Sequence, residues 1–181
     1  MTVGSAEIDP ARFRAVLGHF CTGVTVVTTH DGVAPAGFAC QSFAALSLDP
    51  PLVLFCPARS SGTWPVIERV GRFAVNVLAE HQYEVSAAFG APGADKFASV
   101  CWRRGVSGSP LLEGALTWVE CNLHATLEAG DHYVVVGRVI ALGDPSGGRP
   151  LLFYQGRYTG AEVPRAAAGD LLTWVRQNEW L

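Results

Sequence analysis

The chain has 181 residues, of which 49% are hydrophobic and 16% are charged, so it is long enough and apolar enough to fold around one buried core. Its formal net charge is −3 and no run of Lys or Arg occurs, which argues against nucleic acid or an anionic membrane as a partner. No apolar stretch reaches the roughly 18 residues of a membrane span. Met1–Pro10 lacks the basic start and apolar centre of a signal peptide, so we expect a cytoplasmic protein.

In the first half of the chain the pattern predicts short helices and strands. Asp9–Pro10 is a good helix start, and Phe13, Val16, Leu17 and Phe20 follow at helical spacing. Runs of β-branched and apolar residues separated by turn signals indicate strands. The pattern further predicts strands over residues 24–29, 37–43 and 52–56, a helix over 60–70, a strand over 72–78 and a helix over 80–89.

The clearest alternation in the chain runs over residues 116–128. One face carries Thr117, Val119, Cys121, Leu123, Ala125 and Leu127. The other face carries Trp118, Glu120, Asn122, His124 and Thr126. A mainly apolar face opposite a mainly polar one is typical of a long, half-exposed antiparallel strand.

A turn at Gly130–Asp131 leads to a second long strand over residues 133–142 and, after a loop, to a short strand over 151–154. Residues 164–169 are expected to separate a tail that contains a helix from Asp170 to Gln177.

Many strands at hairpin spacing with few helices predict a mainly β fold, a β-barrel with peripheral helices. We expect a single domain over residues 1–181, with its core at about 13–160 and a C-terminal tail over 161–181. The low charged fraction also indicates that another subunit covers part of the surface.

Common catalytic and metal-binding motifs are missing from the sequence. There is no G-x-G-x-x-G, P-loop, H-E-x-x-H or G-x-S-x-G motif, so Rossmann, ATPase, metalloprotease and α/β-hydrolase functions have no support. The five cysteines form no C-x-x-C pair and read as reduced thiols, and the five histidines lie at no metal-ligand spacing. We therefore expect no metal and no iron–sulfur cluster.

Five blocks of sequence, in register from about Phe13 to Gly160, resemble the flavin reductase-like, FMN-binding split-barrel family. The blocks are GFACQSF with LSLDPPLVL (37–43 and 46–54), GRFAVNVL (71–78), DKF (95–97), GDH (130–132) and RPLLFY (149–154). Within the family, the likeness is greatest to reductase components of actinobacterial hydroxylases that act on a phenolic seco-steroid of cholesterol breakdown. Residues 20–23, 37–48 and 180–181 carry that closer likeness.

The resemblance implies a Greek-key-like split barrel that forms a homodimer, with two flavin sites near the subunit interface. It implies that hydride passes from NADH to FMN or FAD and that the reduced flavin reaches a partner oxygenase, through contact or by diffusion. The resemblance does not decide between FMN and FAD as the flavin. The choice between NADH and NADPH is also open, because Arg157 could bind the 2′-phosphate of NADPH. A tightly bound FMN that serves as an electron carrier, with little NAD(P)H oxidation, is the alternative function. A pyridoxamine-phosphate-type oxidase is a third, without support beyond a shared fold.

The first candidate group lies in the first block, where small side chains let backbone N–H groups approach a flat ring. It comprises Phe38, Ala39, Cys40, Gln41, Ser42, Ala44 and Ala45. Gln41 and Ser42 are candidates for contacts to the N1/O2 edge of a flavin. The alternative is an ordinary packed strand.

The second group offers hydroxyls and one guanidinium for a phosphate. It comprises Arg59, Ser60, Ser61 and Thr63. The alternative is a helix N-cap, because Ser and Thr are common caps. In the block that contains Phe97, Lys96 could add its charge to the same phosphate, or it could be a solvated surface lysine.

His132 follows a turn and is expected at a barrel rim, where the resemblance places it beside flavin and nicotinamide. Hydride transfer needs no acid or base, so we assign His132 a positioning role, against the alternative of a turn histidine bonded to local backbone. The last group could stack on nicotinamide or adenine and bind a pyrophosphate, or it could be core. It comprises Phe153, Tyr154, Gln155, Gly156, Arg157 and Tyr158.

Overall fold

The computed structural model describes residues 8–93 and 95–161, so the predicted separator over 164–169 and helix over 170–177 lie outside the described residues. The helices are α1 (Pro10–Leu17), α2 (Trp64–Val70), the 3-10 helix η1 (Glu80–Gln82) and α3 (Tyr83–Gly90). The strands are β1 (Thr22–Gly23), β2 (Thr25–His30), β3 (Pro35–Cys40), β4 (Ala44–Leu48), β5 (Pro51–Phe55), β6 (Arg72–Val77), β7 (Trp102–Arg104), β8 (Pro110–Leu112), β9 (Thr117–Ala129), β10 (His132–Leu142), β11 (Leu151–Tyr154) and β12 (Arg157–Gly160). Within these described ranges, no helix has the length and apolar character to cross a membrane.

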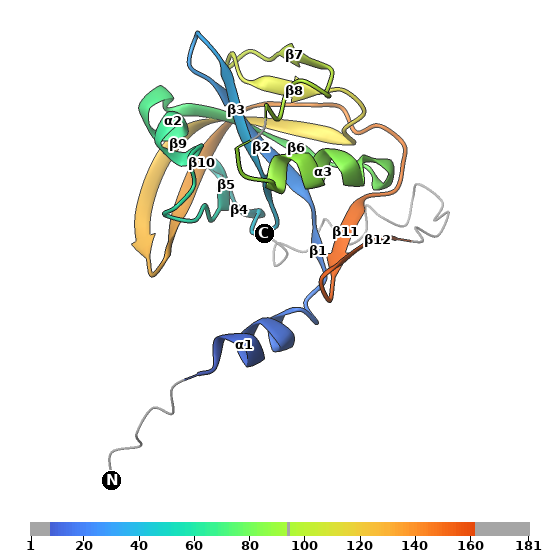
Figure 1. Cartoon of the computed structure of the whole chain (residues 1–181). Coiled ribbons are helices and arrows are strands. Elements are labelled where there is room, and N and C mark those ends of the chain that lie inside the picture. Colours follow the sequence, from blue (N-terminus) through green and yellow to red (C-terminus); the bar gives the residue numbers. More distant parts are fainter. Residues whose placement is uncertain (1–7, 94, 162–181) are drawn as a thin grey trace.

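A strongly curved sheet of seven strands forms the body, in the order β3-β2-β6-β9-β10-β5-β4 (Figure 1). Its neighbouring strands pair antiparallel, as expected for strands joined by hairpins. A second sheet contains β1, β11 and β12, and a third contains β7 and β8. The prediction of a mainly β fold with few helices is confirmed. The two edge strands, β3 and β4, are neighbours in the sequence, and only residues 41–43 join them.

The long pair β9–β10 lies at the centre of this sheet. Its register runs from His132 opposite Ala129 to Leu142 opposite Val119, with two irregularities that bend the strands. At the inner side of this bend, a Cβ on Gly137 would overlap the ring of Phe73, so only glycine fits there. The curvature of the body is therefore set where β10 crosses the core.

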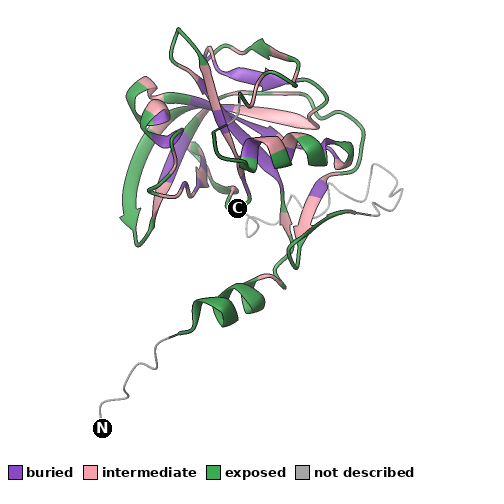
Figure 2. Cartoon of the chain, viewed as in Figure 1, coloured by how far each residue is buried: buried purple, intermediate pink, exposed green. Residues whose placement is uncertain are grey.

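Apolar side chains pack in two clusters on opposite faces of the curved sheet, since the first contains Val27 of β2 and the second contains Val26. The first surrounds Phe55 and Phe73, whose rings meet edge to face with centroids 5.1 Å apart. The second contains Phe89 and Leu151, and it packs α3 and the β11 strand against β2. Figure 2 shows the buried residues concentrated on the central strands, whereas α1 is exposed along its length.

Five strands were not predicted, namely β1, β4, β7, β8 and β12. They are short, and β4 has the sequence Ala-Ala-Leu-Ser-Leu, with none of the β-branched residues that mark a strand. Four predicted elements also differ by several residues in their bounds. The helical spacing extended to Phe20, whereas α1 ends at Leu17. The strand predicted over 37–43 ends at Cys40, α2 begins at Trp64 rather than at residue 60, and the helix predicted over 80–89 is divided between η1 and α3.

The half-exposed polar face predicted for residues 116–128 is wrong at Glu120, which is 0% exposed. Its carboxylate accepts the N–H groups of Val106 and Ser107 at 3.1 and 2.7 Å, and it also accepts the hydroxyl of Ser107. The loop between β7 and β8 covers this face of β9. Alternation in the sequence could not reveal that cover, because the cover comes from a hairpin that was itself not predicted.

We predict that Glu120→Ala lowers the free energy of unfolding by about 3 kcal/mol, because it leaves the two buried donors of Ser107 and the part-buried N–H of Val106 without an acceptor. Urea unfolding followed by circular dichroism measures this difference. Glu68→Ala, at an exposed position of α2, is the matched control and should change stability by less than about 0.5 kcal/mol. An equal, small effect of both substitutions would contradict the role of Glu120 in holding the loop.

Candidate functional site

A cleft of about 1220 Å³ opens where β3 and β5 end and β10 begins, between the start of α2 and the end of α3. It is lined by Phe38, Ala39, Cys40, Gln41, Ser42, Ser60, Ser61, Thr63, Lys96 and His132 among the predicted site residues. Ten of the twenty predicted site residues, from four distant parts of the sequence, therefore meet in one place. The cleft also has a wall that the sequence analysis missed, formed by residues 89–93 at the end of α3.

A hydroxyl network closes the corner between β3 and β5. The Ser42 hydroxyl accepts the N–H of Cys56 at 2.8 Å, donates to the carbonyl of Cys56 at 3.2 Å and lies 3.3 Å from the Cys40 sulfur. The hydrogen-bonding capacity of the Ser42 hydroxyl is therefore used within the protein itself. Among the described residues, the amide of the neighbouring Gln41 has no hydrogen-bond partner, and it is exposed to the cleft.

The polar end of the cleft carries hydroxyls from the segment before α2. Ser60 is exposed, and Ser61 accepts the N–H of Trp64, the first residue of α2, at 3.3 Å. Thr63 is buried and donates to the carbonyl of Gly37 at 3.1 Å, which joins this segment to β3. Ser61 thus supports the start of α2, although the N-cap residue is Thr63, whose side chain makes no cap bond to the helix. Ser60 keeps its hydroxyl available.

Lys96 forms part of the same polar end and is not a solvated surface lysine. Its ammonium donates to the carbonyl of Phe89 at 2.9 Å and to that of Gly37 at 3.3 Å, so it ties the end of α3 to β3. Burial lowers the pKa of Lys96, because the charged form loses hydration. One cation therefore stands in the cleft wall with two of its three donors already used.

His132 lies on the rim, at the first residue of β10, opposite Ala58 in an isolated β-bridge. Its Nδ1 is 2.8 Å from the carboxylate of Asp131, and its side chain is 44% exposed. The hydrogen bond from His132 lowers the pKa of Asp131. This contact fixes the orientation of the ring, with the other ring nitrogen left for a ligand.

Some predicted site residues do not line the cleft. Arg59 forms an ion pair with Glu128 at 2.6 Å, and this carboxylate raises the pKa of Arg59. The guanidinium also lies over the ring of Tyr133. Phe97 packs in the core, with its ring centroid 5.0 Å from that of Phe89. Ala45 lies on β4, opposite Val53 of β5.

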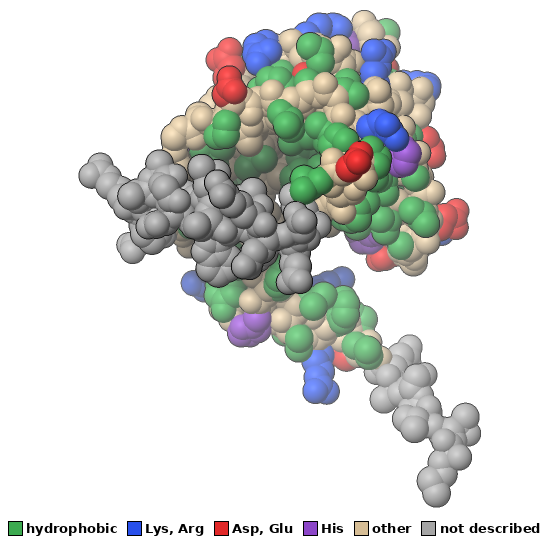
Figure 3. All heavy atoms as spheres, turned by 180° about the vertical axis from the view of Figure 1, so that it is seen from behind, with side chains coloured by type: hydrophobic (Ala, Val, Ile, Leu, Met, Phe, Trp, Pro, Cys, Tyr) green, Lys and Arg blue, Asp and Glu red, His purple; other side chains and the backbone are tan. Residues whose placement is uncertain are grey.

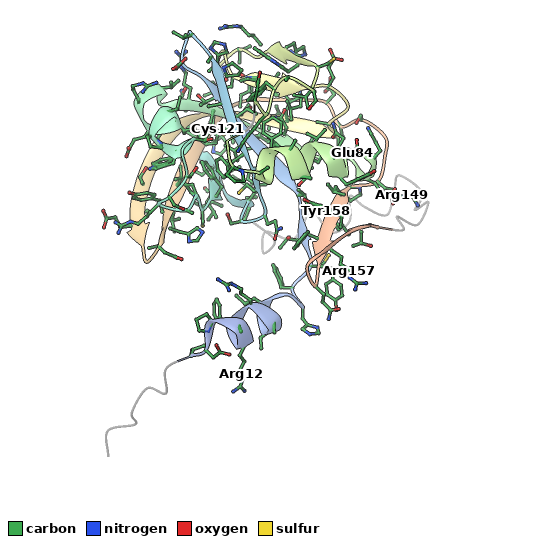
Figure 4. The ribbon with its side chains drawn as sticks, viewed as in Figure 1. Arg12, Glu84, Cys121, Arg149, Arg157 and Tyr158 are labelled. Carbon is green, nitrogen blue, oxygen red and sulfur yellow. The ribbon has the colours of Figure 1, made fainter. Side chains whose placement is uncertain are left out.

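The last group of predicted site residues, 153–158, does not lie in one place. Figure 4 shows Arg157 and Tyr158 on the β11–β12 hairpin, beside the body. The hydroxyl of Tyr158 lies 3.0 Å from that of Ser86, and neither Tyr154, Gly156, Arg157 nor Tyr158 lines the cleft. The remaining three predicted residues, Ala44, Phe153 and Gln155, line a second cavity next to it.

The described residues contain five free cysteines, and two of them are buried. Burial raises the pKa of Cys40, which lines the cleft. Burial, together with the charge of the adjacent Glu120, raises the pKa of Cys121 to about 12. Both thiols are therefore neutral at physiological pH and do not act as nucleophiles there.

Comparison with known proteins decides the family. The sequence model described as "Flavin reductase like domain" matches residues 17–162. The chain belongs to the flavin reductase-like family. It is 52% identical over 186 residues to the reductase subunit HsaB of a flavin-dependent monooxygenase from Rhodococcus jostii, covering 99% of this chain and 95% of that protein. The corresponding subunit from Mycobacterium tuberculosis is 57% identical over 187 residues, covering 98% and 100%.

Solved structures of this family have the same fold. Nitrilotriacetate monooxygenase component B from Mycobacterium thermoresistibile is 52% identical, with a TM-score of 0.82 over 89% of this chain and 93% of that one. An NADH:FAD oxidoreductase from Streptomyces globisporus, SgcE6, in complex with NAD and FAD fragments, is 36% identical, with a TM-score of 0.82 over 90% and 100%. The fold is the split barrel that the sequence resemblance implied.

We predict that iodoacetamide at about pH 8 modifies the exposed Cys21 and Cys101 and spares Cys40 and Cys121, because only thiolates react and burial keeps these two protonated. Mass spectrometry of the digested protein gives the modification of each thiol. The same reaction in concentrated urea is the control, in which all four must react. Alkylation of Cys40 as fast as Cys21 would show that the corner beside Ser42 is open.

Proposed function

We propose that the protein is an NADH-dependent flavin reductase that supplies reduced FMN or FAD to a partner monooxygenase. The observation that carries the proposal is the cleft where β3 and β5 end and β10 begins, in a chain that belongs to the flavin reductase-like family. Support comes from the relatives, one of which is named an NADH:FAD oxidoreductase and was solved with NAD and FAD fragments.

The residues of the cleft fit a flavin. Ala39, Cys40 and Ser42 offer small side chains at the end of β3, an edge strand whose outer backbone groups pair with no neighbouring strand in the described sheet. Such groups can reach the edge of a flat ring, and the Gln41 amide can join them. Ser60 and Lys96 stand at the other end, where a phosphate would be bound. The flavin, when bound, supplies the redox chemistry by accepting hydride from NADH.

The protein's own contribution is positioning. His132, held by Asp131 on the rim, is placed to orient the nicotinamide over the ring, and neither group needs to transfer a proton. Donors along residues 38–42 would stabilise negative charge that develops at the ring edge. Arg59 contributes little to phosphate binding, because Glu128 already neutralises its charge.

We further propose that two copies form a homodimer. Large apolar side chains are exposed on the body. They include Leu46, Leu48, Leu127, Ile140 and Leu142. Hydrophobic side chains also gather on the face of the molecule seen from behind (Figure 3). Apolar surface of this extent is normally covered by a partner. We place the dimer in the cytoplasm, where NADH is available and the thiols stay reduced.

The oxygenase served by this reductase is proposed to hydroxylate a phenolic substrate, a seco-steroid in particular. Identities of 52% and 57% to the HsaB reductase subunits over almost the whole chain support this assignment. The substrate is bound by the oxygenase, so residues of this chain do not select it. Reduced flavin can reach the oxygenase by diffusion, without a stable complex.

We predict rapid oxidation of NADH by the purified protein only when free FMN or FAD is added, measured by the loss of NADH absorbance without any oxygenase. The flavin that gives the higher rate is the preferred substrate. The rate with NADPH in place of NADH shows which nicotinamide cofactor is preferred. A protein that keeps a yellow flavin through gel filtration but does not oxidise NADH would favour the electron-carrier alternative. No oxidation with either flavin and either nicotinamide would reject the reductase function.

We predict that Ser60→Ala raises the Kd of FMN about fivefold, the equivalent of one hydrogen bond of ~1 kcal/mol. Riboflavin, which lacks the phosphate, is the control ligand and should bind both proteins equally. Fluorescence quenching of the flavin on titration gives both constants. An equal loss for riboflavin would place Ser60 at the ring or the sugar instead, and unchanged FMN binding would move the phosphate elsewhere.

A further inference from the structure

A separate hollow of about 500 Å³ lies between the β2–β3 turn, the end of α2, the start of β6 and the loop that joins β7 to β8. Among the described residues, it shares no lining residue with the cleft. In Figure 1 the β2–β3 turn and the β7–β8 pair lie at the end of the body opposite to α1. The exposed leucines and isoleucine named for the proposed dimer do not line it either. The proposed flavin site and the proposed dimer surface therefore leave this hollow unused.

Cations dominate the lining of this hollow, which we call the arginine hollow. It contains Arg69, Arg72, Arg104 and His30, and Asp31 is the acidic residue among them. The Asp31 carboxylate lies 3.0 Å from the Arg69 guanidinium and also accepts two backbone N–H groups of the β2–β3 turn. Within residues 8–93 and 95–161, no carboxylate forms an ion pair with Arg72 or Arg104. Two positive charges of the arginine hollow are therefore unbalanced.

His30 lies between two hydrogen-bond donors and can accept from only one of them. Its Nδ1 is 2.9 Å from the backbone nitrogen of Gly32, and its Nε2 is 3.0 Å from a guanidinium nitrogen of Arg104. A neutral imidazole accepts at one ring nitrogen and carries a proton on the other, so one of these contacts sets two N–H groups against each other. Burial and the charge of Arg104 lower the pKa of His30, which opposes a doubly protonated ring. An acceptor is thus missing beside Arg104.

The backbone that carries the two unbalanced cations is held in place. The loop between β7 and β8 turns two N–H groups inward to the buried carboxylate of Glu120, and a Cβ on Gly105 would overlap that carboxylate. The loop therefore forms a fixed wall that begins directly after Arg104. On the other side, the Thr29 hydroxyl donates to the carbonyl of Arg72 at 2.8 Å. A ligand would find these positions already formed and would not have to order them.

We propose that the arginine hollow is a binding site for a phosphate-type oxyanion, held by Arg72 and Arg104 and hydrogen-bonded beside His30. A guanidinium binds phosphate through paired N–H groups, and two of them balance a phosphate charge of roughly −2. A single carboxylate would leave one of the two cations unbalanced. The phosphate can be the free ion or the ester group of a phosphorylated metabolite, because the same oxygen atoms are bound. The inference does not depend on the proposed function, since it concerns no residue of the cleft.

Calorimetric titration of the full-length protein with sodium phosphate at constant ionic strength tests the site. We expect Arg72→Gln and Arg104→Gln each to raise the Kd of phosphate about tenfold, through the loss of a charged hydrogen-bond donor. Arg12→Gln is the matched control, because Arg12 is exposed on α1, points away from the body (Figure 4) and carries the same charge. It should leave the Kd unchanged. Ser60→Ala, in the cleft, should also leave the Kd unchanged, which separates the two possible phosphate sites.

Backbone amide NMR of the unaltered protein gives a second measurement that needs no variant. Phosphate should shift the resonances of residues 30–32 and 104–108, whereas chloride at the same ionic strength should not. Ribose 5-phosphate distinguishes the sources, because tighter binding than phosphate indicates a phosphorylated metabolite, and equal or weaker binding indicates the free ion. An equal rise in Kd for Arg12→Gln, or a loss of binding confined to Ser60→Ala, would overturn the proposal. The absence of saturable phosphate binding, with no shift of these resonances, would overturn it as well.

Discussion

The hydroxyl of Ser42 ties the segment between the two edge strands to the end of β5. Strands β3 and β4 stand at opposite edges of the main sheet and do not pair with each other, although only residues 41–43 separate them in the chain. Ser42 closes this corner by binding both backbone groups of Cys56, the residue that follows β5. The closure is a point contact rather than a ladder, and the space that it leaves on either side is the cleft and the second cavity.

Several strands could be predicted from the sequence because each one carries its own signal. The β-branched run of β2 and the alternation along β9 identify strands without knowledge of their neighbours. The short β4 and β12 carry no such signal, because they exist through pairing with β5 and β11. The prediction that Glu120 lies on an exposed face was wrong for a physical reason. Alternation identifies the two faces of a strand, but it does not reveal what packs against the polar face.

The candidate site was predicted in the same partial way. Family blocks identified the residues of β3 and of the β10 rim, hydroxyls and one charge identified the segment before α2, and the curved sheet brings these together. Two features depend on partners that no local pattern reveals. Arg59 was predicted as a phosphate ligand because of its charge, and Glu128, distant in the sequence, takes that charge. The wall at the end of α3 reaches the cleft because Phe89 packs in the core against Gly37 of β3 and Lys96 bonds the carbonyls of both residues.

The charges of the cleft bear on whether a flavin would be kept or released. A site that retains FMN permanently needs strong, buried cations around the phosphate, because such interactions gain most where water is excluded. Here Lys96 spends two donors on backbone carbonyls, Arg59 is neutralised by Glu128, and Ser60 is exposed to solvent. The phosphate would therefore be held mainly by hydroxyls and one shared cation. Such a site favours a flavin that binds, is reduced and leaves, as a reductase that feeds a separate oxygenase requires, over a flavin that stays as an electron carrier.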